Sequence, residues 1–160
     1  MEQTPEPETT DSSAASDSEY APPATAWVRE QLEQIDAAGG DTAAVGIQGR
    51  AVVVLTMHGR RSGKLRRVPL MRVEHDGVYA AVASKGGAPD HPDWFYNLVA
   101  DASVDLHDGT THTATMARQI EGEERAQWWP RCVEAFPTYA DYQAGTEREI
   151  PVFLLEPVAE

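Results

Sequence analysis

The stretch AVVVLTMHGRRSGKLRRVPLMRVEHDGVYAAVA, residues 51–83, decides the fold. It holds three extended segments, rich in β-branched and aliphatic residues, at 51–57, 65–73 and 78–83. A turn with two glycines separates the first two segments, and Asp76-Gly77 is a strong hairpin signal before the third. The stretch therefore predicts neighbouring antiparallel strands.

Segments outside this stretch extend the pattern. Further strands are expected at 104–107, 111–118 and 151–155, and helices at 25–38, 91–100 and 122–135, with a short helical stretch from residue 137. Thr25 and Asp90 are the expected caps of the first two helices, and Gly39-Gly40 ends the first. Six strands joined mostly by hairpins predict an α+β fold, mainly antiparallel β, with the sheet closed into a barrel. Rossmann and P-loop folds are excluded, because no GxGxxG follows a strand and no Walker loop is present.

The composition divides the chain into three parts. Residues 1–24 are rich in Glu, Ser, Thr, Pro and Ala and predict a disordered acidic tail. Residues 25–40 are expected to form the N-terminal helix and a linker, and residues 41–160 the barrel domain. The N-terminal helix can pack on the barrel, cover a substrate or touch a membrane, and packing is the default expectation.

Charge is spread unevenly along the chain. The formal net charge of -13 argues against nucleic acid as a partner. Residues 50–72 nevertheless contain no acid and carry seven basic residues: Arg50, Arg60, Arg61, Lys64, Arg66, Arg67 and Arg72. Two interpretations remain open: an anion-binding segment, or a solvated hairpin with ordinary surface arginines.

The single cysteine, Cys132, excludes an intrachain disulfide and cannot form a zinc site alone. We expect Cys132 to be a packed residue of a helix. A single cysteine also fits the reducing cytoplasm, which is the location we expect for the protein. The apolar runs are too short to cross a bilayer. Contact with a membrane surface and pairing into a homodimer are left open.

Three segments could carry chemistry. HGRRSGKLRRVPLM, residues 58–71, combines turn glycines with forked arginine donors and indicates an anion site. ASKGGAPDHPDWFYNL, residues 83–98, places Lys85 and two glycines before a helix N-terminus, which suits a phosphate group as well as a merely structural loop. In FPTYADYQ, residues 136–143, Tyr139 and Tyr142 share a helix face, either as packed rings or as a substrate wall.

Other familiar chemistries are absent from the pattern. The five histidines lack metal-ligand spacing, Ser84 lacks a GxSxG elbow, and no metal site is predicted. Asp90 and Asp93 flank a helix start, where acids stabilise the helix. An anion cradle with aromatic walls and no catalytic constellation indicates that a cofactor supplies the chemistry.

The runs VVVLTMHGRRSGKLRRVPL, ASKGGAPDHPDWFYNL and GEERAQWWPRCVEAFPTYADYQAGTEREIPVFLLEP resemble the deazaflavin (F420)-dependent nitroreductase and quinone reductase family. The resemblance covers roughly residues 45–157 and rests on the combination of GRxSG, SKGG, HPxWxxN and TxREIP. It implies a split β-barrel, similar to the FMN-binding flavin reductases, with peripheral helices. It also implies coenzyme F420, whose phosphate and oligoglutamate tail would account for a basic segment in an acidic protein.

The resemblance further implies which residues form the site. The residues expected to bind the cofactor are Arg60, Arg61, Ser62, Arg66, Arg67, Val68, Pro69, Leu70, Met71, Val82, Ala83, Ser84, Lys85, Asp93, Trp94, Phe95, Tyr96, Asn97 and Tyr139. Those expected to act in catalysis are Tyr139, Ser84 and Tyr142.

The expected activity is hydride transfer from reduced F420 to a quinone, a nitro compound or another electron-poor acceptor. Some family members carry tyrosine where this chain has Phe136 and Met71, which implies a different substrate preference. Two alternatives remain: an FMN-dependent reductase on the same barrel, and a non-catalytic protein that binds F420 or lipid.

Overall fold

The computed structural model describes residues 26–47 and 49–158. Its strands are β1 (Val52–His58), β2 (Leu65–Met71), β3 (Val73–His75), β4 (Val78–Val82), β5 (Ser103–Asp108), β6 (Thr111–Ile120) and β7 (Val152–Pro157). Its α-helices are α1 (Ala26–Ala37), α2 (Asp93–Ala100), α3 (Gly122–Ala135) and α4 (Thr138–Ala144). Two short 3-10 helices are η2 (Thr42–Ala44) and η3 (Lys85–Gly87).

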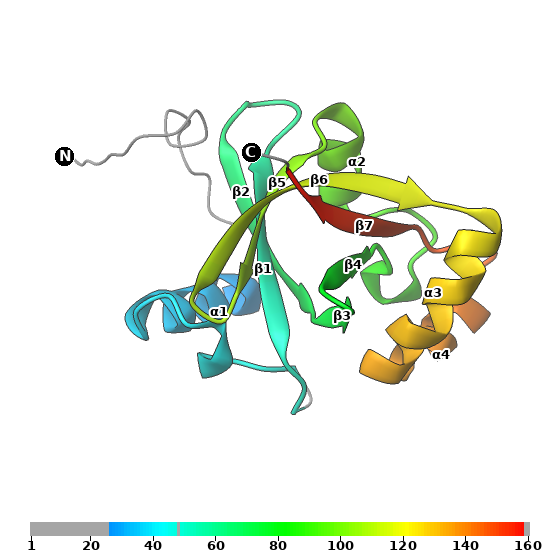
Figure 1. Cartoon of the computed structure of the whole chain (residues 1–160), viewed down its shortest axis with the longest axis horizontal. Coiled ribbons are helices and arrows are strands. Elements are labelled where there is room, and N and C mark those ends of the chain that lie inside the picture. Colours follow the sequence, from blue (N-terminus) through cyan, green and yellow to red (C-terminus); the bar gives the residue numbers. More distant parts are fainter. Residues whose placement is uncertain (1–25, 48, 159–160) are drawn as a thin grey trace.

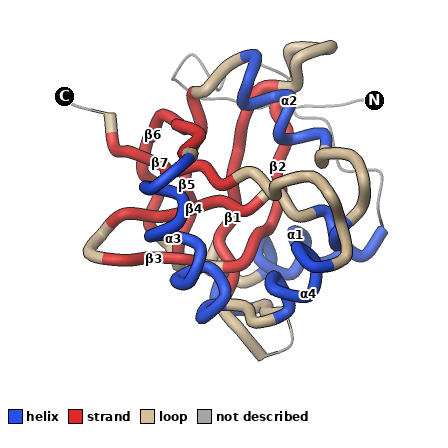
Figure 2. The backbone as a smooth tube through the Cα atoms, turned by 90° about the vertical axis from the view of Figure 1, so that its right-hand side faces the viewer, coloured by secondary structure: helices blue, strands red, loops and turns tan. Residues whose placement is uncertain are grey.

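The strands form one antiparallel sheet in the order β2-β1-β5-β6-β7-β4-β3. β2 and β3 lie at opposite edges of this sheet, yet only Arg72 separates them in the chain. The two edges must therefore approach each other, and the sheet curls into a half-barrel (Figure 1). Figure 2 shows the strands curling around one centre with the helices outside them. This confirms the predicted α+β split barrel with peripheral helices.

Two details of the predicted element pattern are wrong. The segment 65–73 is two strands that meet at Arg72, because residues up to Met71 pair with β1 whereas residues from Val73 pair with β4. The backbone N–H of Arg72 still donates to the carbonyl oxygen of Ala51 at 3.0 Å, and its guanidinium binds Asp108 at 3.0 Å. Asp90 does not cap α2, which starts at Asp93 after an extended Pro92. The Asp90 carboxylate instead accepts a hydrogen bond from Lys85 Nζ at 3.0 Å. Thr25 lies outside the described residues.

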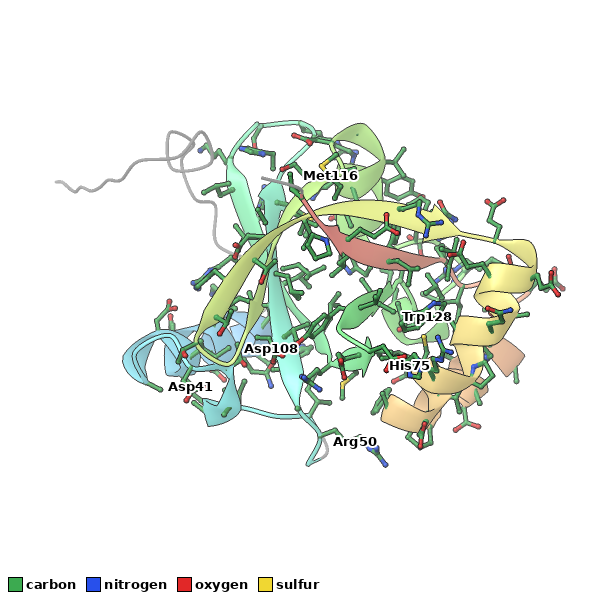
Figure 3. The ribbon with its side chains drawn as sticks, in the orientation of Figure 1. Asp41, Arg50, His75, Asp108, Met116 and Trp128 are labelled. Carbon is green, nitrogen blue, oxygen red and sulfur yellow. The ribbon has the colours of Figure 1, made fainter. Side chains whose placement is uncertain are left out.

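Two helices pack against the sheet through identifiable contacts. Leu32 and Ile35 of α1 are buried with Val54 of β1, as the default expectation for this helix required. On α3, Trp128 meets His75 of β3 edge-on, with ring centroids 6.0 Å apart (Figure 3). These contacts leave the ends of β2 and β4 to be covered by α2 and α4, where the site forms.

Within residues 26–47 and 49–158, none of the helices has the length and apolar character needed to cross a membrane. The predicted acidic tail lies outside the described residues. The division into tail, helix and barrel domain, the cytoplasmic location and the membrane-surface contact stay predictions.

Candidate functional site

A pocket of about 260 Å³ opens where β2, β4, η3, α2 and α4 meet. Its lining is mainly apolar, with three hydroxyl-bearing residues and one lysine among them. The lining residues are Trp27, Ile47, Pro69, Leu70, Met71, Val82, Ser84, Lys85, Gly86, Pro92, Trp94, Phe136, Tyr139 and Tyr142.

The loop that follows β4 has an unusual backbone. Lys85, Gly86 and Gly87 all have positive φ, at 47°, 63° and 82°. A non-glycine residue in this region is strained, and such strain concentrates at ligand sites. Position 87 also requires a residue without a side chain, because a Cβ there would lie 3.0 Å from the carbonyl oxygen of Tyr142. Glycine thus lets α4 pack directly on the loop, which brings the second and third predicted segments together.

Tyr139 is the most buried hydroxyl of the pocket, with 4% of the residue exposed. Its ring packs against Phe136 at a centroid distance of 5.0 Å. Burial raises the pKa of Tyr139 above its ordinary value. A tyrosine is protonated at physiological pH in any case, so the hydroxyl can donate a hydrogen bond. The hydroxyl has no hydrogen-bond partner among the described residues, and it is not one of the fully buried polar atoms without a partner, so the oxygen keeps some accessible surface. A ligand in the pocket could supply that partner.

Lys85 places a positive charge at the pocket. Its ammonium group forms an ion pair with Asp90 at 3.0 Å, and the lysine side chain is 45% exposed. The same contact holds the pKa of the Asp90 carboxyl below its usual range. An anionic ligand at Lys85 would therefore compete with a solvent-exposed carboxylate, and exposed ion pairs are weak.

The arginine-rich turn, residues 58–64, packs against α2 through Arg60. Both the backbone N–H of Arg60 and its guanidinium donate to the side-chain oxygen of Asn97, each at 3.0 Å. The guanidinium also donates to the carbonyl oxygen of Asp93 at 3.2 Å. Arg67 is engaged elsewhere, in a two-pronged pair with Asp36 of α1 at 2.9 Å. These two arginines hold elements together.

The pocket brings together nine of the predicted site residues: Pro69, Leu70, Met71, Val82, Ser84, Lys85, Trp94, Tyr139 and Tyr142. The other eleven do not line it: Arg60, Arg61, Ser62, Arg66, Arg67, Val68, Ala83, Asp93, Phe95, Tyr96 and Asn97. Several of these have structural contacts of their own, such as Ser62, whose hydroxyl accepts from the Lys64 N–H at 3.1 Å.

Sequence reasoning left some pocket residues out of the predicted site. Trp27 and Ile47 come from the N-terminal helix and the segment before β1, and no local motif marks them as neighbours of the loop. Gly86, Pro92 and Phe136 also line the pocket, and they lie inside the quoted segments. Arg148, from the TxREIP motif, does not line the pocket, but its guanidinium donates hydrogen bonds to the carbonyl oxygens of the loop after β4.

Cys132 is fully buried in α3, as expected of a packed residue. Burial raises the pKa of its thiol to about 12. Among the residues that the structure describes, no three metal-ligating side chains gather in one place.

Comparison with known proteins identifies the family. The model of the F420H(2)-dependent quinone reductase family matches residues 27–157. A solved F420-H2 dependent reductase is 51% identical, with a TM-score of 0.64 over 70% of this chain and 99% of its own. A solved domain-swapped dimer is also 51% identical, with a TM-score of 0.66 over 82% of this chain and 98% of its own. An F420H(2)-dependent quinone reductase of Mycobacterium tuberculosis is 30% identical over 106 residues, which are 64% of this chain and 71% of that protein. The chain belongs to the F420H(2)-dependent quinone reductase family, and is thus an oxidoreductase whose cofactor is coenzyme F420.

Proposed function

We propose that this protein passes a hydride from reduced F420 to a quinone within the pocket formed by β2, β4, η3, α2 and α4. The observation that carries the proposal is the convergence of Ser84, Tyr139 and Tyr142 on one apolar pocket beside Lys85. Three hydroxyl donors on apolar walls suit a flat ring with carbonyl oxygens at its edge.

The residues present fit the cofactor in two parts. Pro69, Leu70, Met71 and Trp94 offer apolar walls for a ring system. The pocket, at about 260 Å³, is below the usual size for a whole drug-sized ligand, so the phosphate and oligoglutamate tail would lie outside it. Lys85 at the pocket and Arg61, on the turn that packs against α2, would supply positive charge for that tail. Arg61 is exposed and has no ion-pair partner among the described residues.

Reduced F420, when bound, supplies the hydride. The chain's own contribution is to orient the acceptor, exclude water and donate hydrogen bonds to the oxygen that gains negative charge. Tyr139 is suited to this role because it lines the pocket, is 4% exposed and carries a hydroxyl that can donate. Such a donor contributes about 2.7–4 kcal/mol in oxyanion holes, and we expect less here because a quinone is an easily reduced acceptor.

The acceptor we favour is a quinone over a nitro compound. Phe136 and Met71 both line the pocket, and neither can donate a hydrogen bond. A site built to bind polar substrate oxygens discriminates through such donors, so their absence should weaken the orientation of a nitro group. We also infer a homodimer, which the similarity to the domain-swapped dimer supports.

The test mixes the purified full chain with reduced F420, with or without menadione, and follows absorbance; a parallel reaction uses reduced FMN. Oxidation of F420 that depends on menadione supports the proposal. Turnover with FMN alone would favour the flavin alternative. Binding of F420 without oxidation by menadione would leave a non-catalytic binding protein.

A further inference from the structure

An arginine from a distant part of the chain binds both ends of the loop that shapes the pocket. Arg148 lies between α4 and β7, and its guanidinium donates to the carbonyl oxygens of Ser84 at 2.7 Å and Ala88 at 2.8 Å. It also donates to the carbonyl oxygen of Ala83 at 3.2 Å. One side chain therefore ties the start of the loop to its end.

Arg148 is itself fixed by its neighbours. Its carbonyl oxygen accepts from the Gln143 side chain at 2.8 Å, and the same Gln143 side chain accepts from the Ile150 N–H at 2.9 Å. The guanidinium is half-buried and planar, with several donors in a rigid arrangement that suits convergent carbonyl oxygens. The three carbonyl oxygens are bound by three different nitrogens, whereas a lysine carries its donors on a single nitrogen and cannot reproduce this spread.

The loop needs this support because its backbone provides little of its own. The bonds across η3 run from Gly87 N to Ser84 O at 2.9 Å and from Ala88 N to Lys85 O at 3.1 Å. Lys85 lies between them in a left-handed conformation, which a free loop would relax. Since Ser84 and Lys85 both line the pocket, the shape of this loop decides where the Ser84 hydroxyl and the Lys85 ammonium point.

The fourth contact of Arg148 makes the arrangement sensitive to protons. Arg148 Nη1 lies 3.0 Å from His91 Nδ1. Arginine can only donate, so His91 Nδ1 must accept, and His91 must be neutral with its proton on Nε2. Protonation of His91 would turn Nδ1 into a donor and set two cations against each other.

The surroundings of His91 act in both directions. Burial and the Arg148 charge lower the pKa of His91, while Asp90 raises it by a smaller amount. Asp90 is shared with Lys85 through their ion pair. The remaining neighbours are the Phe95 and Tyr96 rings of α2, with centroids 4.1 Å and 5.9 Å from the imidazole.

We propose that Arg148 is a positioning residue that holds the Ser84–Ala88 loop in its cofactor-binding shape, and that protonation of His91 releases this hold. The proposal rests on the proposed function only in naming F420 as the ligand of the loop. When Arg148 holds the loop, its guanidinium donates to His91, which must then be neutral. When the loop is released, His91 regains its ordinary pKa of about 6.5. The hold is therefore complete above about pH 6.5 and weakens as the pH falls below it.

The first experiment needs no cofactor. Amide hydrogen exchange of residues 83–91 is followed from pH 5 to pH 8, after correction for the intrinsic exchange rate. Protection in the wild-type protein should fall on the acid side. His91→Asn keeps an acceptor near the Nδ1 position but does not titrate, so its protection should not fall there. His112→Asn, a change to an exposed histidine on β6, is the matched control and should behave as wild type.

The second experiment measures F420 affinity by calorimetry over the same pH range. Arg148→Lys should weaken binding about tenfold, because charge-assisted bonds to the loop carbonyls are lost, while the surface change Arg118→Lys should not. Because the cofactor can titrate, only the difference between wild type and His91→Asn counts, and it should appear below about pH 6.5.

The outcomes separate the two proposals. Equal acid loss of loop protection in wild type and His91→Asn overturns the proton-sensitive part, whatever F420 does. Undiminished protection and affinity in Arg148→Lys overturn the positioning role. Should Arg148→Lys fail to fold, the comparison of wild type with His91→Asn still decides the pH part. Absence of F420 binding at every pH would defeat the proposed function and leave the exchange result standing.

Discussion

Gly87 offers the sharpest test of how the loop and α4 are packed. The change is Gly87→Ala, and the matched change is Gly86→Ala at the neighbouring position. Both glycines have positive φ, at 82° and 63°, so both changes bring the backbone strain of a left-handed alanine, about 1–2 kcal/mol. Only at Gly87 does the new methyl group meet backbone, 3.0 Å from the oxygen and 3.2 Å from the Cα of Tyr142. At Gly86 nothing lies within 4 Å.

The difference between the two variants isolates the contact with α4. Overpacking against backbone that cannot move aside costs about 1–3 kcal/mol. For a chain of this size, each kcal/mol lowers the melting temperature by about 2–4 °C, so Gly87→Ala should melt roughly 2–12 °C below Gly86→Ala. Thermal unfolding followed by circular dichroism gives both values, and urea unfolding checks the free-energy difference. Equal melting temperatures for the two variants would refute the close packing of α4 on the loop.

Three further predictions concern single side chains. Tyr139→Phe should slow quinone reduction roughly tenfold in stopped-flow assays while F420 affinity stays nearly the same; unchanged turnover would remove the Tyr139 hydroxyl from the mechanism. Arg61→Ala and Lys85→Ala should each weaken F420 binding more at low salt than at high salt, as calorimetry in a salt series would reveal, and a salt-independent loss would argue against charge contacts. Cys132 should resist iodoacetamide at pH 8 in the native protein and react after unfolding, because burial holds its thiol pKa at about 12; rapid native alkylation, detected by mass spectrometry, would contradict this.

Local sequence pattern was sufficient for most elements of the fold. The β-branched run at 51–57 and the Asp76-Gly77 turn have strong local preferences, and β1 and the β3–β4 hairpin form there. The region around Arg72 could not be predicted in this way. At Arg72 the chain changes from pairing with β1 to pairing with β4, and which strands become neighbours is decided by the tertiary structure.

The candidate site divides along the same line. Segments with their own glycine and aromatic signals, such as the loop at Ser84 and the pair Tyr139 and Tyr142, were found from sequence and meet at one pocket. Trp27 and Arg148 reach the same region only because the chain folds back on itself. The sequence pattern also did not predict the ion pair between Asp90 and Lys85. The two residues meet across a loop whose backbone conformation at Lys85, with positive φ, has no sequence signal of its own.

The basic segment shows how composition can overstate a binding site. Two interpretations of residues 50–72 were open, an anion site or ordinary surface arginines. The contacts assign structural roles to part of the segment, and binding of an anion by the remainder stays a prediction. Four of its arginines, Arg50, Arg60, Arg67 and Arg72, bind groups of the protein itself. Arg60 in particular offers its donors to α2, so its loss should disturb the turn before it alters any charge contact with a ligand. The number of arginines in an acid-free stretch therefore does not predict how many of them bind an anionic ligand. The acids that pair with these arginines can come from distant elements, as Asp36 and Asp108 do here.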